Sequence, residues 1–374
     1  MKKILSTTAL ASALLLSANY GYAQTTITGQ LDLGYKAYEA KKTTKASESF
    51  RGFTRETQIN VQNKGKLSNG VDYAAGFAWE IDGSESVSNG GTAADNAGTT
   101  HGAFSENTYI NFISGNTTLH IGADHIQNPN FEITNLAGGV ADIDDLVAER
   151  RQAGNAVASG DSSLAAVHKT NDASSGSQAH GIGLIQNFGV ARASILYTPG
   201  GAAMANDGSG NSLGTDSGQS QIEVMVRGDM GVKGLDAFIY RGMQDSDTPG
   251  TSGRTEDVTG TKYGLSYNFG QFSLAASQSK VTSTASIDAK TTSLGAAFAV
   301  NKELTVGFIH SKTSADGVTT TATSVVPDET LKAINIGYNL GPVVANVVLV
   351  DSENVGGVSG TDPKVFFVNL TTKF

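Results

Sequence analysis

The stretch KVFFVNLTTKF, residues 364–374, shows the pattern that decides the fold. Counting back in twos from Phe374 gives Thr372, Leu370, Val368 and Phe366. The residues between them are Lys373, Thr371, Asn369, Phe367 and Val365. A period of two is typical of a β-strand, whose successive side chains point to opposite faces. One face of this strand is mostly apolar and the other is mixed.

The same alternation recurs along the chain. We predict sixteen strands, at residues 25–38, 53–62, 71–82, 105–113, 118–124, 179–186, 190–197, 219–227, 235–241, 258–268, 271–281, 290–300, 303–311, 329–340, 343–350 and 364–374. The connectors after even-numbered strands are short, and those after odd-numbered strands are long and rich in Gly, Ser, Asp and Thr. Short turns on one side and long loops on the other are typical of an antiparallel transmembrane β-barrel, with the short turns periplasmic and the long loops extracellular.

Two other all-β architectures remain as alternatives. A β-sandwich also alternates, but its polar face meets bulk water and long and short loops rarely alternate through eight hairpins. A β-solenoid requires a fixed short repeat, and none is visible. Aromatic residues near strand ends, such as Trp79, Tyr267 and Phe366, favour the barrel, because aromatic girdles mark the two membrane interfaces.

The first residues and the overall composition indicate that the protein is exported and exclude one class of partner. The first residues combine Lys2 and Lys3 with an apolar run from Ala9 to Ala18 and small residues before Gln24, which predicts a signal peptide over residues 1–23. The chain of 374 residues has 45 glycines and no cysteine, as expected for a β-protein held without disulfides. Without Lys2 and Lys3, 24 basic residues face 35 acidic ones, a net charge of −11. This charge argues against nucleic acid as a partner.

Four short motifs resemble one family. The segment from Thr26 to Gly34, TITGQLDLG, resembles the opening strand of the Gram-negative general porins. LSNGVDYAAGFAWE (67–80) and TLHIGAD (118–124) resemble a turn with the third strand and the fifth strand of that family. The terminal Phe374 resembles the family's assembly signal. The resemblance implies a sixteen-stranded trimeric barrel of a Gram-negative outer membrane that carries small hydrophilic solutes and ions.

The same resemblance implies how the chain assembles. The barrel-assembly machinery reads the final strand, where the candidate signal residues are Phe366, Val368, Leu370 and Phe374. We expect these side chains to face outer-membrane lipid while the last strand closes the barrel against residues 25–38, so that no sheet edge remains.

The longest connector, residues 125–178, is the candidate constriction. A loop this long is usually functional or disordered, and in the family the third long loop folds into the lumen. Its segment DIDDLVAERR is compatible with a short helix, and a solvated surface loop is the alternative. The loop carries seven acids and three bases. The candidate constriction residues are Glu132, Asp142, Asp144, Asp145, Glu149, Arg150 and Arg151.

The candidate lumen wall follows from the period of two. The residues predicted to line it are Lys36, Gln58, Glu80, Asp124, Arg192 and Lys262, with Lys290 as a further inward cation. Gln58 and Ala123 stand where the family often has arginine. Because charge in a narrow passage sorts ions by sign, the excess of acids predicts a weakly cation-selective, passive channel.

Enzymatic functions find little support. His120, Asp124 and His125 suggest a metal cluster, but a strand places His125 on the face opposite the other two. We expect no catalytic residue, metal or cofactor. The alternative function from another class is an adhesin or structural surface barrel whose long loops bind a partner.

Overall fold

The computed structural model describes residues 23–41, 48–87, 103–123, 133–134, 136, 180–198, 221–244, 258–283, 288–316, 327–354, 359–360 and 362–374. The first eight strands are β1 (Gln24–Lys41), β2 (Glu48–Lys66), β3 (Asp72–Val87), β4 (Ala103–Ser114), β5 (Thr117–Ala123), β6 (His180–Asn187), β7 (Ala191–Thr198) and β8 (Gln221–Gly228). The other eight are β9 (Leu235–Gln244), β10 (Val258–Phe269), β11 (Phe272–Ser283), β12 (Asp288–Ala299), β13 (Leu304–Asp316), β14 (Glu329–Asn339), β15 (Val343–Glu353) and β16 (Asp362–Lys373).

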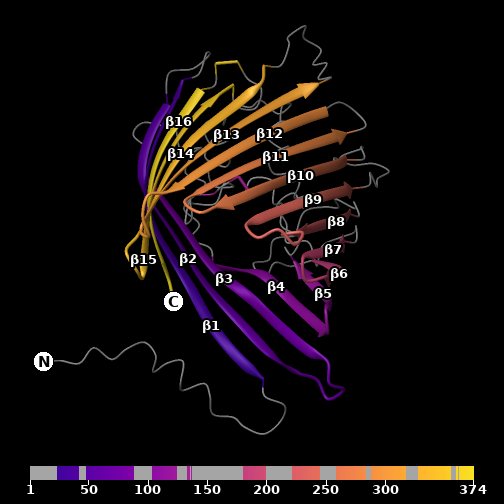
Figure 1. Cartoon of the computed structure of the whole chain (residues 1–374). Helices are drawn as coiled ribbons and strands as arrows, with labels where there is room; N and C mark the ends of the chain where they lie inside the picture. The colour runs from indigo at the N-terminus through magenta and orange to yellow at the C-terminus, as the bar shows by residue number, and fades with distance from the viewer. Residues whose placement is uncertain are drawn as a thin grey trace, which may run out of the picture.

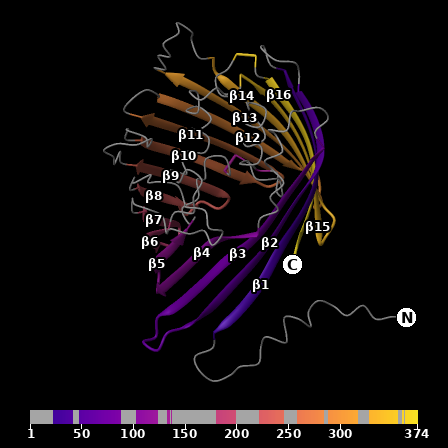
Figure 2. The ribbon, with the colours of Figure 1, turned by 180° about the vertical axis from the view of Figure 1, so that it is seen from behind.

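These strands form one closed barrel. Each strand pairs with its neighbours in the sequence, and β1 pairs with β16 to complete the ring. Figures 1 and 2 show the ring from opposite sides, with strongly tilted strands. Tilt is expected, because a sheet can close into a barrel only if its strands incline to the barrel axis. The prediction of a sixteen-stranded antiparallel barrel is confirmed.

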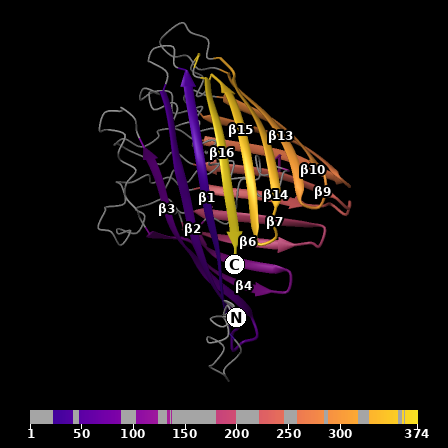
Figure 3. The ribbon, with the colours of Figure 1, turned by 90° about the vertical axis from the view of Figure 1, so that its left-hand side faces the viewer.

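The closing seam joins the two ends of the described chain. The register runs from Gln30 opposite Lys373 to Lys41 opposite Asp362, and Figure 3 shows β1 and β16 side by side. Beyond that ladder, the Gly29 amide donates to the Phe374 carbonyl at 2.7 Å, and the Phe374 amide donates to the Gly29 carbonyl at 3.0 Å. A Cβ atom at residue 29 would overlap the Phe374 ring. Glycine therefore lets the ring lie flat across the seam.

The outer face of the barrel is apolar and exposed. On β16, Phe366, Leu370 and Phe374 are 38%, 45% and 67% exposed, and Val368 is half-buried. Three ring contacts link Tyr267, Phe269, Phe272 and Phe298, with centroid distances of 6.1, 5.9 and 4.7 Å. Exposed large side chains on the other strands include Ile27, Leu33, Ile121, Ile182, Ile195, Ile239, Leu265, Leu274, Leu294 and Ile334. A continuous outward apolar surface is what a lipid-facing barrel requires.

The inner face is buried and largely polar. Side chains that alternate with the exposed apolar ones include Glu223, Lys262, Ser277, Ser293, Thr291, Ser311, Asn335 and Asn346, and all are at most 5% exposed. Between them lie apolar residues such as Phe238, Ile309 and Val348. On β12 the exposed residues are even-numbered, so Lys290 shares the outward face of Leu294. The prediction that Lys290 points inward is wrong.

Two of the short turns on one rim of the barrel are built by the same chemistry. At residues 188–190 and 340–342, a glycine adopts positive φ, with Gly189 at 87° and Gly341 at 90°. In each turn an asparagine side chain two residues earlier, Asn187 or Asn339, accepts a hydrogen bond from the glycine amide at 2.8 Å. Such Asx turns reverse the chain in few residues.

The opposite rim carries the other connectors. Those after β3, β5, β7, β9 and β13 are long, whereas residues 42–47 after β1 and 284–287 after β11 form connectors about as short as turns. The predicted contrast between the two rims is therefore less regular than expected. No helix in the described ranges is long and apolar enough to cross a membrane.

Candidate functional site

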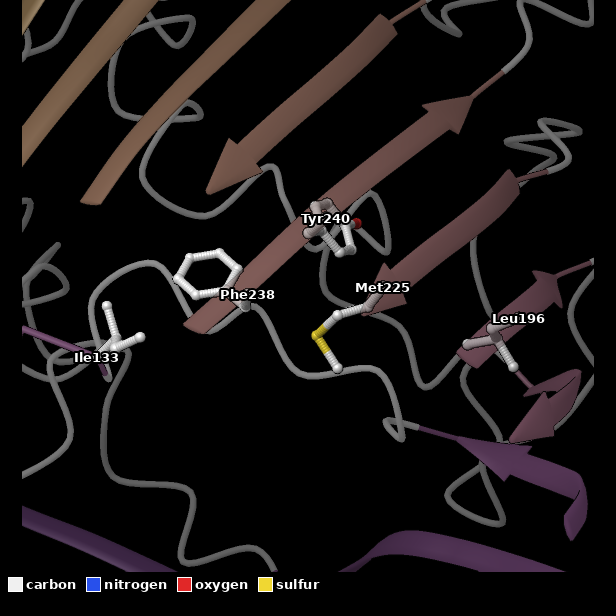
Figure 4. Close-up of a cluster of buried hydrophobic side chains, with 5 residues drawn as sticks. All are labelled: Ile133, Leu196, Met225, Phe238 and Tyr240. Carbon is white, nitrogen blue, oxygen red and sulfur yellow. The ribbon is translucent and has the colours of Figure 1, made fainter. Parts of the chain in front are cut away.

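Part of the third long connector lies inside the barrel. Ile133, which is 2% exposed, packs in a buried cluster with Leu196 on β7, Met225 on β8, and Phe238 and Tyr240 on β9. Figure 4 shows Ile133 beside Phe238 and on the same side of the sheet as the other three side chains. We call Leu196, Met225, Phe238 and Tyr240 the loop-docking wall.

The next residue fixes the same segment by its backbone. The carbonyl of Thr134 lies against Gly295 on β12, so closely that a Cβ atom at residue 295 would overlap it. Gly295 shares the inner face with Ser293 and Ala297, which are buried. Two adjacent loop residues therefore contact the inner face at β7–β9 and at β12, which places this part of the connector in the barrel interior.

A buried polar cluster lies within the loop-docking wall. The Tyr240 hydroxyl donates to Glu223 Oε1 at 2.5 Å, and Lys262 Nζ lies 5.6 Å from the centre of the Tyr240 ring. All three residues are at most 4% exposed. A cation over an aromatic ring and a hydroxyl on a carboxylate are both stabilising contacts. Together they fix the Tyr240 ring within the loop-docking wall.

The inner face of β14, β15, β16, β1 and β2 carries a row of amide side chains. Asn346 and Asn369 are register partners on β15 and β16, and Gln30 and Gln58 are register partners on β1 and β2. Asn335, on β14, is the diagonal neighbour of Asn346. We call Asn335, Asn346, Asn369, Gln30, Gln58 and Asn60 the amide belt.

Hydrogen bonds connect several members of the amide belt. Gln30 Nε2 donates to Asp32 at 2.5 Å, and Asn369 Nδ2 donates to the same carboxylate at 3.3 Å. Asn60 Nδ2 donates to Gln58 Oε1 at 3.3 Å. The amides thus surround Asp32, which is 8% exposed, with hydrogen-bond donors.

Two rows of hydroxyl groups lie on the inner face between the loop-docking wall and the amide belt. Thr291 and Thr313 share a hydrogen bond of 2.9 Å between their Oγ1 atoms, and Ser293 Oγ donates to Ser311 Oγ at 3.1 Å. All four residues are at most 2% exposed. Within each pair the two hydroxyl groups hydrogen-bond to each other across β12 and β13, and neither pair carries a charge.

The predicted lumen-wall residues fall in different places. Lys262 belongs to the buried cluster at β9 and β10, and Lys36 lies 5.4 Å from the ring of Phe367 on the inner face. Arg192 shares the inner face with Ser194 and is exposed at the short-turn end of β7. Its register partner, Arg227, forms a 2.8 Å ion pair with Asp236.

Other predicted residues lie outside the described part of the chain. They are Asp124 and all seven constriction candidates, Glu132, Asp142, Asp144, Asp145, Glu149, Arg150 and Arg151, together with the predicted helix and signal peptide. For Glu80 the backbone is described on β3, whereas the side chain is not. His120 pairs through Nδ1 with Asn111 Oδ1 at 2.7 Å. Within the described ranges, no three acidic or histidine side chains form a metal-binding group.

Sequence reasoning missed two features of this site. No periodic signal in the sequence distinguishes Ile133 from the other apolar residues of its connector. The amide belt was readable only in part: the period of two puts each amide inward, but the cross-strand register that aligns them appears only in the sheet.

Comparison with known proteins decides the family. A sequence model of the Gram-negative porins matches residues 6–368. The chain belongs to the Gram-negative porin family. It is accordingly an outer-membrane channel protein, as the closed barrel with an apolar exterior also indicates. No curated protein matches the sequence.

Solved porin-like structures share the fold. One is a loop-deletion mutant of OmpT, an outer membrane protein of Vibrio cholerae, with 13% identity, a TM-score of 0.56, and coverage of 94% of this chain and 99% of that one. Another is a triple mutant of the Rhodopseudomonas blastica porin, with 11% identity, a TM-score of 0.52, and coverage of 94% and 100%. Identities this low show the shared fold alone.

Proposed function

We propose that this porin is a passive channel for small hydrophilic solutes and ions, weakly selective for cations, and that its third long connector forms the constriction. The observation that carries the proposal is the contact of Ile133 and Thr134 with the inner face of the barrel. A connector held there narrows the passage, and charge in a narrow, partly desolvated passage acts more strongly than charge on an open surface. The proposal assigns no catalytic step, metal or cofactor to the chain.

The sign of selectivity follows from charge. In the sequence of the connector 125–178, the acids Glu132, Asp142, Asp144, Asp145 and Glu149 outnumber Arg150 and Arg151. On the barrel wall, the neutral Gln58 occupies an inward position of β2. Salt screens exposed charges beyond about 8–10 Å, so acids within the constriction should dominate over those on the surface. Lys36 and Lys262 keep the preference weak.

A reversal potential in a KCl gradient tests this proposal. The protein in a planar bilayer should conduct stepwise, with the sign of potential that K⁺ passing faster than Cl⁻ produces. The variant Asp142→Asn/Asp144→Asn/Asp145→Asn should shift the potential toward zero. The matched control Asp245→Asn/Asp247→Asn/Asp257→Asn removes three acids from another connector and should leave the potential in place. A potential of anion sign in the unmodified protein would refute cation selectivity, and an unmoved potential in the first variant would place the three acids outside the constriction.

We propose further that the protein is exported with residues 1–23 removed, inserted by the barrel-assembly machinery, and assembled as a homotrimer surrounded by outer-membrane lipid. The outward positions of Phe366, Leu370 and Phe374 support recognition of the last strand. Deletion of Phe374 removes both hydrogen bonds with Gly29 and should strongly reduce the amount of heat-modifiable barrel in outer-membrane fractions. The control Phe272→Ala removes another outward ring, 49% exposed against 67% for Phe374, that lies away from the seam, and it should assemble nearly normally. Normal assembly of the deletion variant would contradict this role.

A further inference from the structure

The amide belt contains buried polar atoms that the described protein leaves without partners. Asn335 and Asn346 are both 0% exposed. In each residue neither the amide nitrogen nor the amide oxygen has a hydrogen-bond partner among the described residues. Asn369 Oδ1 and Ser352 Oγ, on the same inner face, share this condition. Leaving a buried polar group unpaired is destabilising, so these four residues together are an unusual local arrangement.

The position of these atoms shows what they face. The outward side chains of β14 and β15, such as Ile334 and Leu349, are each 45% exposed and apolar. Asn335 and Asn346 alternate with them and point to the inner side of the barrel. Their unpaired groups are therefore directed toward the barrel interior and away from lipid.

We propose that the amide belt is a binding track for neutral polyhydroxylated solutes such as sugars, an inference that rests on the channel function proposed above. An amide offers a donor and an acceptor side by side, and a hydroxyl group does the same. A sugar therefore satisfies both ends of each amide. An anion accepts hydrogen bonds but leaves the amide oxygens unpaired, and a cation binds the oxygens but leaves the amide nitrogens unpaired.

The charges around the belt agree with a neutral ligand. Asp32, the carboxylate within it, already accepts hydrogen bonds from Gln30 and Asn369. Lys36 lies at the ring of Phe367. The inward residues next to Asn335 and Asn346, Ala333 and Val348, are buried and uncharged, and the carboxylate of Glu329 lies six residues from Asn335 along β14. A neutral solute also keeps less of its free energy in hydration than an ion does, so it enters a partly desolvated site at lower cost.

Raffinose, a neutral trisaccharide, is the probe. We expect it to reduce the single-channel KCl current in a saturable way, beyond its effect on the conductivity of the bulk solution. Triethylene glycol dimethyl ether is the control solute, because it carries acceptors but no donors. It should reduce the current only as far as it reduces bulk conductivity. A raffinose effect that merely follows bulk conductivity, in a protein that conducts KCl, overturns the binding track and leaves the channel function intact. Absence of any KCl current would instead overturn the channel function itself.

The variant Asn335→Leu/Asn346→Leu locates the effect. Both side chains lose their hydrogen-bonding groups at nearly constant size, and the apparent raffinose dissociation constant should rise by about tenfold. Thr291→Val/Thr313→Val is the matched control, because it removes a buried polar pair from the same inner face outside the belt. It should bind raffinose as the unmodified protein does. Equal raffinose binding by both variants overturns the proposal.

Stability separates binding from a structural role. If the amides of Asn335 and Asn346 stabilise the folded barrel, their replacement by leucine should lower its heat resistance. If they instead bind a solute, the leucine variant should have the same heat resistance or a higher one. Should the double variant fail to assemble, Asn60→Leu at the other end of the belt supplies the same raffinose measurement. If Asn335→Leu/Asn346→Leu does not assemble and Asn60→Leu binds raffinose as the unmodified protein does, the proposed binding track is overturned.

Discussion

The two sides of the barrel interior differ in what they contact. The loop-docking wall on β7–β9 packs apolar side chains around Ile133, and Tyr240 is held there by Glu223 and Lys262. The amide belt on β14–β16, β1 and β2 has polar groups directed at the barrel interior, several of them without a hydrogen-bond partner among the described residues. The first wall is completed by the protein's own connector. In the proposal made above, a solute supplies the missing partners of the second.

This difference separates two tasks that one passage requires. A constriction needs a segment held in place, which apolar packing and backbone contact achieve at Ile133 and Thr134. A surface that solutes cross needs groups that exchange partners readily, which neutral amides allow without the strong attraction of full charges. The first two predictions below each alter one side and leave the other unchanged, and the third alters the strands between them.

The largest effect is expected from Ile133→Asp. A carboxylate cannot be buried among Leu196, Met225, Phe238 and Tyr240 without losing its hydration, and truncation of a buried isoleucine alone costs about 2–5 kcal/mol. The segment should leave the loop-docking wall, and single-channel conductance should rise. The amide belt should be unaffected, so raffinose should still bind.

Ile133→Leu is the control for that experiment, because it conserves volume and apolarity and should cost less than about 1.5 kcal/mol. It should keep the unmodified conductance. Equal conductance in all three proteins would mean that Ile133 does not hold the constriction.

A smaller effect is expected from Gln58→Arg on the amide belt. One added positive charge about 10 Å from a passing ion contributes roughly 1–2 kcal/mol at an effective dielectric constant of about 20. The reversal potential in a KCl gradient should move toward anion preference, while total conductance changes little because the loop-docking wall is intact. Gln58→Met adds no charge and should leave the potential where it is. A potential that Gln58→Arg does not move would place this residue away from the path of ions.

The smallest effect is expected from Thr291→Val/Thr313→Val between the two walls. Removing both partners of a hydrogen bond with isosteric apolar groups is close to neutral, within about 1 kcal/mol. The urea midpoint of the folded barrel should barely change, and both conductance and reversal potential should stay the same. The single variant Thr313→Val tests the pairing, because it removes the Thr313 partner of the buried Thr291 hydroxyl and should be less stable than the double variant. Equal stability of the two would show that the bond contributes nothing.

Much of the fold could be predicted from the sequence because each strand alternates. The sixteen strands lie where the period of two places them. Their ends were less predictable: β2 extends over 48–66 and β3 over 72–87, beyond the predicted 53–62 and 71–82. Outside the apolar band the side chains lose the alternation, yet the backbone ladder continues, as the register of Arg51 opposite Val87 shows.

The site was less predictable because its contacts are not periodic. The inward direction of Lys36, Arg192 and Lys262 follows from parity alone. The prediction that Lys290 points inward is wrong by the same rule, because Lys290 lies at an even-numbered position of β12, like the exposed Leu294. The docking of Ile133 onto Leu196, Met225 and Phe238 joins an irregular connector to strands far along the chain, and no local pattern encodes such a contact.

The seam between β1 and β16 changes what a break in the chain would do. Asp32 and Asn369, which meet there, are 337 residues apart in sequence, and closing a loop of that length costs about 5 kcal/mol of entropy. Once closed, however, the sheet has no free end. If a protease cuts one long connector, each fragment remains paired along two seams, one at β1 and β16 and the other beside the cut. Closure therefore gives this barrel the tolerance of a ring, in which a single cut opens the covalent chain but separates nothing.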